Sequence, residues 1–242
     1  MSLKITNLKV AFGSFIAVDE ISFQVLPGAV HFVIGANGAG KTSCSDAISG
    51  LAPGQGSVQL DGTEILGTPV HRIARMGVGR TFQTASVFEE LSVLQNLDIA
   101  CGIHRPLRAL LGVRHRVDPR IEHALEVTGL ADLVNAQAGT LSHGQKQWLE
   151  IAMLLVQDAQ VLMLDEPVAG MSEEERVATG ELLQRVARGR VVLVVEHDME
   201  FMRRFATRVT VMNRGTILCE GSVDEIQANP DVQSIYLGTA GK

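Results

Sequence analysis

A glycine-rich segment near residue 40 carries the clearest chemical signal in the sequence. The segment GANGAGKTS at residues 35–43 fits the pattern G-x-x-x-x-G-K-[ST] and follows an apolar run at residues 30–34. Glycines in such a loop let backbone N–H groups approach phosphate oxygens, and a following helix adds its positive N-terminal end. The lysine would contact the β- and γ-phosphates, and the threonine hydroxyl would ligate Mg²⁺. The predicted phosphate-binding residues are Gly35, Asn37, Gly38, Ala39, Gly40, Lys41, Thr42 and Ser43.

Two adjacent acids end a second apolar run. The stretch VLMLDEP at residues 161–167 places Asp165 and Glu166 at the tip of a predicted buried strand, the usual position for chemistry in an open α/β sheet. We expect Asp165 to hold Mg²⁺ or its water, and Glu166 to orient and deprotonate an attacking water. Taken alone, Asp-Glu-Pro is more often an ordinary polar turn. Combined with the phosphate loop, it predicts hydrolysis of a nucleotide rather than binding alone.

A third motif, LSHGQ at residues 141–145, precedes a helical pattern. Ser142 and Gln145 have the spacing of a capping box, which predicts that a helix begins here with a glycine-containing, anion-binding end. The helix would be amphipathic, with Trp148 on its apolar face, so core packing alone explains that tryptophan.

The apolar patterns predict the elements that would hold these motifs. Alternation between residues 3 and 25 is typical of antiparallel strands, and helical spacing replaces strand signals from about Thr84 to Val156. The turn at residues 213–215 predicts a hairpin. Continuous apolar runs, typical of parallel strands covered on both faces, occur at residues 30–34, 161–164 and 191–195.

Composition narrows the class of protein. The 242 residues carry a formal net charge of −6, which disfavours a protein whose main task is binding a nucleic-acid backbone. Apolar runs such as residues 151–156 fall far short of the roughly 20 residues that a membrane-spanning helix needs. Three scattered cysteines indicate neither a disulfide framework nor a metal site.

With these motifs in this order, the chain resembles the ABC ATPase family, whose signature LSGGQ it matches except at His143. The resemblance covers nearly the whole sequence. It implies an α/β P-loop NTPase fold, with a RecA-like parallel sheet, an antiparallel β-subdomain and an inserted α-helical subdomain. We therefore expect a single ABC ATPase domain, residues 1–242, with an ATP-binding core lobe at residues 1–83 and 157–242 and a helical lobe at residues 84–156.

The resemblance also assigns roles to residues that would be unremarkable alone. Phe12 matches the aromatic that stacks on adenine, Gln83 in GRTFQT matches the Q-loop glutamine that links Mg²⁺ and water to the helical lobe, and His197 matches the switch histidine at the γ-phosphate. In the family, the signature of one subunit closes over ATP bound by the other. This adds the signature residues to the ATP site: Ser142, His143, Gly144 and Gln145.

Some positions depart from the family pattern. His143 stands where glycine is common, and it either contacts nucleotide across the dimer or faces water. Ser172 replaces a frequent aspartate, and its spacing to Glu175 predicts a helix N-cap, which leaves a role for Ser172 in cross-dimer communication in doubt.

The sequences of several segments resemble those of the ATPases of branched-chain amino-acid and urea or short-amide importers. EHDMEFM at residues 196–202 and NPDVQSIYLG at residues 229–238 look like that branch, and SHGQKQWLEIAM at residues 142–153 looks most like the urea type. The resemblance therefore implies ATP-driven uptake of urea or a short amide, with uptake of branched-chain amino acids as the alternative. The implied partners are two membrane-spanning permease subunits, a paralogous ATPase or a second copy of this chain, and an extracytoplasmic solute-binding protein. The implied location is the cytoplasmic face of the inner membrane.

Two other interpretations are weaker. A soluble ABC mechanoenzyme acting on DNA or ribosomes would carry a coiled-coil or zinc insertion, and the sequence between Gln83 and Ser142 has neither heptads nor paired cysteines. A small P-loop kinase would not explain LSHGQ. Arginines between Arg105 and Arg120 form a basic cluster that suits lipid headgroups or an acidic partner surface, or a solvated connection.

Overall fold

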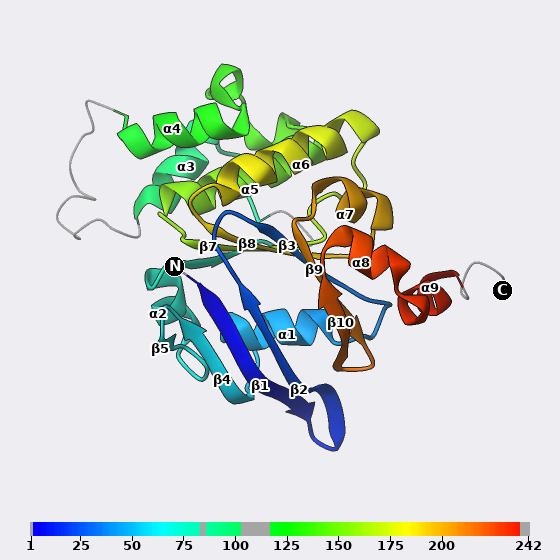
Figure 1. Ribbon diagram of the computed structural model, residues 1–242. Helices are drawn as coiled ribbons and strands as arrows, with labels where there is room; N and C mark the ends of the chain where they lie inside the picture. Colours follow the sequence, from blue (N-terminus) through cyan, green and yellow to red (C-terminus); the bar gives the residue numbers. More distant parts are fainter. Residues whose placement is uncertain (1, 83–85, 103–116, 238–242) are drawn as a thin grey trace.

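The N-terminal strands form an antiparallel sheet. A computed structural model describes residues 2–82, 86–102 and 117–237, with the side chains of residues 235–237 excepted. The sheet has the strand order β2-β1-β4-β5 (Figure 1). Its strands are β1 (Leu3–Phe12), β2 (Phe15–Val25), β4 (Gln55–Leu60) and β5 (Thr63–Glu64). The predicted alternation is confirmed, because apolar residues of β1 and β2 alternately face the core.

A second, six-stranded sheet has the order β10-β9-β3-β8-β7-β6. Five neighbouring strands run parallel, and β9 and β10 form the predicted antiparallel hairpin around residues 213–215. The strands are β3 (Val30–Ile34), β6 (Val78–Arg80), β7 (Val161–Asp165), β8 (Val191–Glu196), β9 (Arg208–Asn213) and β10 (Thr216–Gly221). The α/β fold class with a parallel and an antiparallel sheet is confirmed.

The central parallel strands are buried on both faces, which explains their nearly continuous apolar sequence. Val33 and Met163 point into one apolar core, where α1 (Lys41–Ile48) packs between the two sheets. Phe32 and Leu164 point into a second core, which is formed with helices on the opposite face. Side chains that alternate between two cores fix the strand register, and therefore fix which residues emerge at the carboxyl ends of the strands.

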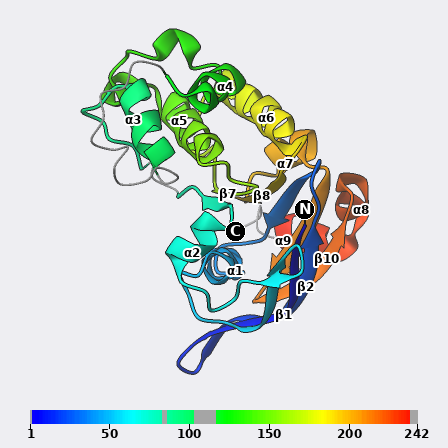
Figure 2. The same cartoon turned by 90° about the vertical axis from the view of Figure 1, so that its left-hand side faces the viewer.

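The second core is covered by helices that lie above the sheet in Figure 1 and are seen from the side in Figure 2. Helices α3 (Val93–Cys101), α4 (Pro119–Thr128) and α5 (His143–Val156) pack against one another, with 3₁₀ turns at Ala131–Leu133 and Ala138–Thr140. The other described helices are α2 (Val70–Arg75), α6 (Glu173–Ala187), α7 (Met199–Phe205), α8 (Val223–Ala228) and α9 (Pro230–Leu237).

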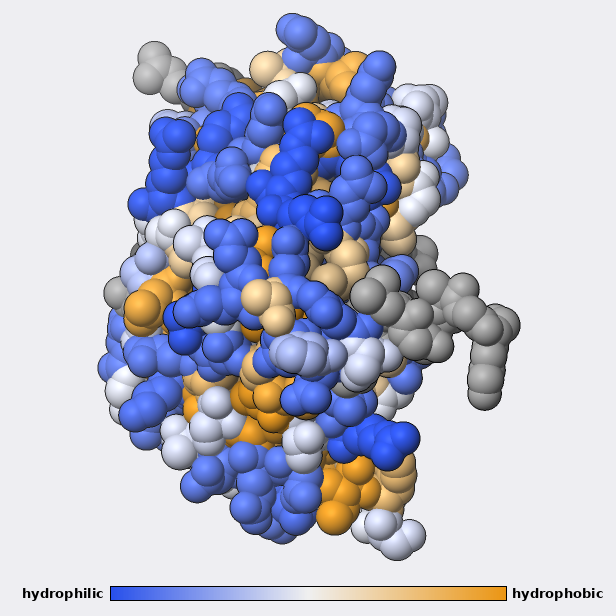
Figure 3. Space-filling model, turned by 45° about the vertical axis from the view of Figure 1, so that its right-hand side comes forward, coloured by the Kyte–Doolittle hydropathy of each residue, from blue (hydrophilic) through white to orange (hydrophobic). Residues whose placement is uncertain are grey.

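Hydrophilic side chains cover most of the face shown in Figure 3, above all over the helices in its upper part. In the described ranges, every helix is too short or too polar to cross a lipid bilayer. Of the Arg105–Arg120 cluster, residues 105–116 lie outside the described ranges, and Arg120 forms an ion pair with Asp118.

Candidate active site

The glycine-rich loop joins β3 to α1 and forms one wall of a cavity of about 350 Å³. The first residues of β2 form another wall, and Glu166 and Val195 close it at the ends of β7 and β8. Seven of the eight predicted phosphate-binding residues line the cavity, the exception being Gly35. The loop residues that line it are Asn37, Gly38, Ala39, Gly40, Lys41, Thr42 and Ser43.

Backbone geometry explains one glycine of this loop in particular. Gly40 has a φ of 98°, in the left-handed region that favours glycine, and a β-carbon there would collide with the carbonyl oxygen of Ala17. The loop can therefore turn into α1 only with glycine at this position. As the N-cap of α1, Gly40 has no side chain between the first N–H groups of the helix and the cavity.

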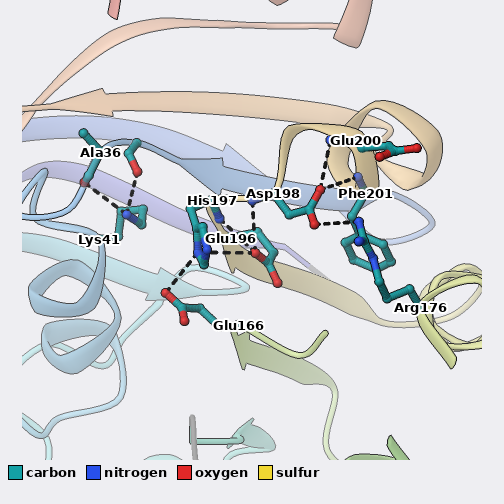
Figure 4. Close-up of polar contacts among 10 residues, drawn as sticks. Ala36, Lys41, Glu166, Arg176, Glu196, His197, Asp198, Glu200 and Phe201 are labelled. Atoms are coloured by element: carbon teal, nitrogen blue, oxygen red, sulfur yellow. Dashed lines mark hydrogen bonds and ion pairs between the residues drawn. The ribbon is translucent and has the colours of Figure 1, made fainter. Parts of the chain in front are cut away.

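Lys41 lies at the start of α1 and is nearly buried. Its Nζ donates hydrogen bonds to the carbonyl oxygens of Gly35 (2.7 Å) and Ala36 (3.2 Å), so the ammonium group lies within the loop that it follows (Figure 4). Burial lowers the pKa of Lys41, and the nearby carboxylates of Glu166 and Asp165 oppose that shift. A phosphate in the cavity would meet a positive charge that is already partly stripped of water.

The side chains of Asp165 and Glu166, at the end of β7, have different surroundings. Asp165 is buried, and its Oδ2 lies 3.2 Å from Nη2 of Arg80, the last residue of β6. Burial raises the pKa of Asp165, and Arg80 opposes the rise. Glu166 has a φ of 48°, a left-handed conformation that is costly for a non-glycine residue, and its N–H donates to the carbonyl of Val195 at 2.9 Å. This turn directs Glu166 into the cavity.

His197 lies beside Glu166 at the end of β8 (Figure 4). Its Nδ1 is 3.3 Å from Oε1 of Glu166 and 3.7 Å from Oε2 of Glu196. Glu196 is buried, and its Oε2 accepts the backbone N–H groups of His197 and Asp198. Burial raises the pKa of Glu196. The imidazole is thus held between an acid of the cavity and a buried acid of β8.

The signature segment begins α5, as predicted, with both hydrogen bonds of the capping box present. Ser142 Oγ accepts the N–H of Gln145 at 3.2 Å, and the Gln145 side chain accepts the N–H of Ser142 at 3.0 Å. None of residues 142–145 lines the cavity of the phosphate loop. The exposed His143 lies beside Gly170, which leaves both interpretations of its role open. Ser172 caps α6 in a second capping box with Glu175, and its predicted N-cap role is confirmed.

The predicted adenine-stacking residue, Phe12, does not line the cavity, and Gln83 lies outside the described residues. Phe12 is half exposed at the end of β1 and pairs across the hairpin with Phe15 of β2. It is Phe15, not Phe12, that lines the cavity together with Ala17.

The grouping of a phosphate-loop lysine with a glutamate and a histidine suits attack of water on a bound phosphate. Comparison with known proteins decides the family. The family description "ABC transporter" matches residues 18–169, and "Branched-chain amino acid ATP-binding cassette transporter" matches residues 216–242. The chain belongs to the ABC transporter family. It is an ATP-hydrolysing subunit of that family, and its C-terminal segment matches the branched-chain amino acid cassette description.

Relatives of this ABC ATPase match over its whole length. It is 37% identical to BraF of Pseudomonas aeruginosa, a high-affinity branched-chain amino acid transport ATP-binding protein, over 98% of both chains. It is 35% identical to LivG of Escherichia coli K12, which has the same description, again over 98% of both chains. It also resembles the ADP conformation of MJ1267, an ATP-binding cassette of an ABC transporter, with a TM-score of 0.85 and 28% identity over 98% of this chain and 99% of that one.

Sequence reasoning missed four residues of the ABC ATPase that contact the predicted ones. Arg80 and Glu196 are the last residues of short strands. A charged residue at the end of a buried strand needs a partner, and this could have identified them from the sequence. Phe15 shares a strand face with Ala17, so period-2 alternation would have found it. For Glu175 the sequence predicted the capping box of its own helix but not its contact with Ser142.

Proposed function

We propose that this chain hydrolyses ATP in an importer of branched-chain amino acids, and that ATP closes two ATPase subunits against each other. The observation that carries the hydrolytic part is the position of Glu166, which lines the same cavity as the phosphate loop and contacts His197. ATP binding and ATPase activity follow from the family. The roles of individual residues below are proposals.

In this proposal the loop N–H groups and Lys41 hold the β- and γ-phosphates. Glu166 accepts a proton from the attacking water, and His197 orients Glu166 and contacts the γ-phosphate. The contact with Glu196 holds the imidazole in place during that step. The strained backbone at Glu166 fixes the carboxylate in advance, which is the kind of preorganisation that hydrolysis requires.

The residues present fit a magnesium site. The Thr42 hydroxyl and the Asp165 carboxylate are hard oxygen donors, and within the described ranges no cluster of three or more His, Cys, Asp or Glu side chains competes for a metal. Thr42, Asp165 and Gln83 would hold Mg²⁺ together with phosphate oxygens and water. Bound there, Mg²⁺ would neutralise charge on the phosphates.

The site needs a second subunit in this proposal. Ser142, His143, Gly144 and Gln145 lie outside the cavity of their own chain, and a helix N-terminus with a serine cap and a glycine in its first turn suits a phosphate supplied from elsewhere. We therefore assign these residues to the ATP of the opposite subunit, either a paralogue or a second copy. For the adenine ring, Phe15 is a stronger candidate than Phe12, because Phe15 lines the cavity.

The permease partners would contact a second cavity, of about 270 Å³, between β6, α2 and α5. Its lining is largely apolar and includes the exposed Phe82. Three of its lining residues each carry one buried polar atom without a hydrogen-bond partner among the described residues: Arg80 Nε, Thr81 Oγ1 and Glu150 Oε2. We propose that a short cytoplasmic helix of a permease docks here, against the largely apolar lining. We also propose that the chain divides into a core lobe (residues 1–83 and 157–242) and a helical lobe (residues 84–156), with this cavity beside both.

The location and the remaining partners are also part of the proposal. The chain would lie on the cytoplasmic face of the inner membrane, held by two permease subunits, and an extracytoplasmic binding protein would select the solute. The net charge of −6 supports the absence of a nucleic-acid partner.

Between the two candidate solutes, the relatives favour branched-chain amino acids over urea. BraF and LivG are named for branched-chain amino acids. The segment that resembled the urea type contains Trp148, whose Nε1 donates to Thr179 Oγ1 at 2.8 Å within the chain. A tryptophan engaged in internal packing gives no information about a transported solute.

Purification of the native complex tests this function. We expect the co-purified binding protein to bind leucine, isoleucine or valine in calorimetry and not urea, and the ligand-loaded protein to stimulate ATP hydrolysis. Glu166→Gln should lower hydrolysis at least about 100-fold while retaining ATP, because it removes the base and leaves the phosphate contacts. Size-exclusion chromatography should then show more closed dimer with ATP than for wild type. Urea binding would reverse the choice of solute, and a Glu166→Gln complex that neither retains ATP nor gains dimer would overturn the mechanism.

A further inference from the structure

Helices α5 and α6 lie side by side (Figures 1 and 2), and Glu175 lies in the first turn of α6. Its Oε2 accepts the N–H of Ser172 at 3.0 Å and completes the cap of its own helix. Its Oε1 accepts the hydroxyl of Ser142 at 2.6 Å, 33 positions away in the sequence. The backbone of Gly144 lies close to this carboxylate, because a β-carbon built there would be 2.8 Å from Oε1. One acid is therefore hydrogen-bonded to one signature residue and lies against a second.

The second contact is not needed to cap either helix. Gln145 already completes the capping box of α5, and Ser172 with Glu175 completes that of α6. Gly144 leaves room for the carboxylate, since a β-carbon at that position would lie 2.8 Å from Glu175 Oε1. The contact thus depends on a glycine at the second position of α5.

The Glu175 carboxylate is a fixed negative charge at the signature. Hydrogen bonds from Ser142 and Ser172 lower the pKa of Glu175, so it remains ionised at neutral pH. The positive ends of two helices favour the charge further. The carboxylate thus binds the signature in the way that an anionic ligand would.

We propose that Glu175 is a positioning residue that occupies the signature donors in the separated subunit and competes with the γ-phosphate for them. This inference rests on the proposed closure of two subunits over ATP. In the closed state Ser142 and Gly144 would donate to the phosphate, and a carboxylate that is bound to Ser142 and lies against Gly144 would repel it. Closure then requires Glu175 to give up Ser142, which raises the ATP concentration at which the subunits associate.

The charge of Glu175 can be removed without removing the helix cap. Glutamine also completes a capping box at this position, so Glu175→Gln should keep α6 intact and still accept a hydrogen bond. Its unfolding midpoint in denaturant should match that of the parent. Glu174→Gln is a matched control, because Glu174 is exposed and its substitution removes the same charge one position away.

The test measures the ATP concentration that gives half-maximal dimer for the chain with its partner ATPase, in a Glu166→Gln background that prevents hydrolysis. Light scattering after size-exclusion chromatography provides the readout. We expect Glu175→Gln to dimerise at an ATP concentration lower by on the order of fivefold, since it removes repulsion between like charges at short range. The difference should shrink at high salt, and Glu174→Gln should resemble the parent.

The result separates this inference from the proposed function. A Glu166→Gln parent that fails to bind fluorescent ATP and to dimerise would overturn the proposed function itself. A parent that dimerises normally, with Glu175→Gln requiring as much ATP as Glu174→Gln or more, would overturn the competition alone. The second outcome would make Glu175 a purely structural cap.

Discussion

Asp165 at the end of β7 and Ser142 at the start of α5 are fixed in opposite ways. Asp165 is buried and pairs with Arg80, whose side chain is 7% exposed and also lies 2.6 Å from Asp46. Ser142 is exposed and is held by an acid that is itself accessible to water. Breaking a buried ion pair leaves an uncompensated charge, whereas water replaces a broken surface contact at little cost. The pair at the end of β7 is therefore costly to break, whereas the contact at the start of α5 can exchange its partner.

Removing Arg80 should have the largest effect on stability, because it leaves one of these two contacts without its cation. Arg80→Met would leave Asp165 buried without its cation, which we expect to lower the free energy of unfolding by about 3 kcal/mol. The loss should be larger at pH 8 than at pH 5, because burial favours the protonated acid and the folded state then binds more protons than the unfolded chain. Urea titrations at the two pH values measure both effects.

Arg208→Met is the control for this change. Arg208 pairs with Glu220 at 2.6 Å but is 52% exposed, so its loss should cost less than about 1 kcal/mol. Equal losses for the two variants would show that burial does not set the strength of the pair at Asp165.

The contrast also separates what the sequence could predict from what it could not. Local spacing predicted the phosphate loop, the acids at the end of β7 and both capping boxes, because each depends on neighbours within a few residues. The contact between Arg80 and Asp165 joins residues 85 positions apart, and that between Ser142 and Glu175 joins residues 33 apart. Such contacts depend on which elements become neighbours. Spacing alone therefore predicted the candidate site residues but not the residues that hold them in place.

Glu150 of α5 should make the stability of the protein depend on pH. It is buried in α5, its Oε1 accepts the N–H of Ser86 at 2.6 Å, and burial raises its pKa to about 7. In the unfolded chain this carboxyl has its ordinary pKa of 4.5, so the contribution of Glu150 to stability should fall as pH rises from about 4.5 to 7 and change no further above that. Glu150→Gln should remove that fall and gain on the order of 2 kcal/mol at pH 8.

Thermal and urea unfolding of Glu150→Gln from pH 5 to pH 8 measure the difference. Glu126→Gln in α4 is the matched control, since it removes an exposed carboxylate from a neighbouring helix. A Glu150→Gln profile that runs parallel to that of the wild type would show that burial does not raise the pKa of Glu150.

The smallest effect concerns the other link between α5 and α6. Trp148→Phe keeps an apolar ring but removes the hydrogen bond from Nε1 to Thr179 Oγ1, and we expect a loss of about 1 kcal/mol, because Thr179 Oγ1 retains its bond to the Glu175 carbonyl. A double-mutant cycle with Thr179→Val would isolate the pair. This link carries no net charge, so its removal should leave the ATP concentration for dimer formation unchanged, unlike Glu175→Gln. If Trp148→Phe lowered that concentration as much as Glu175→Gln, the flexibility of the helix pair, and not the charge of Glu175, would control closure.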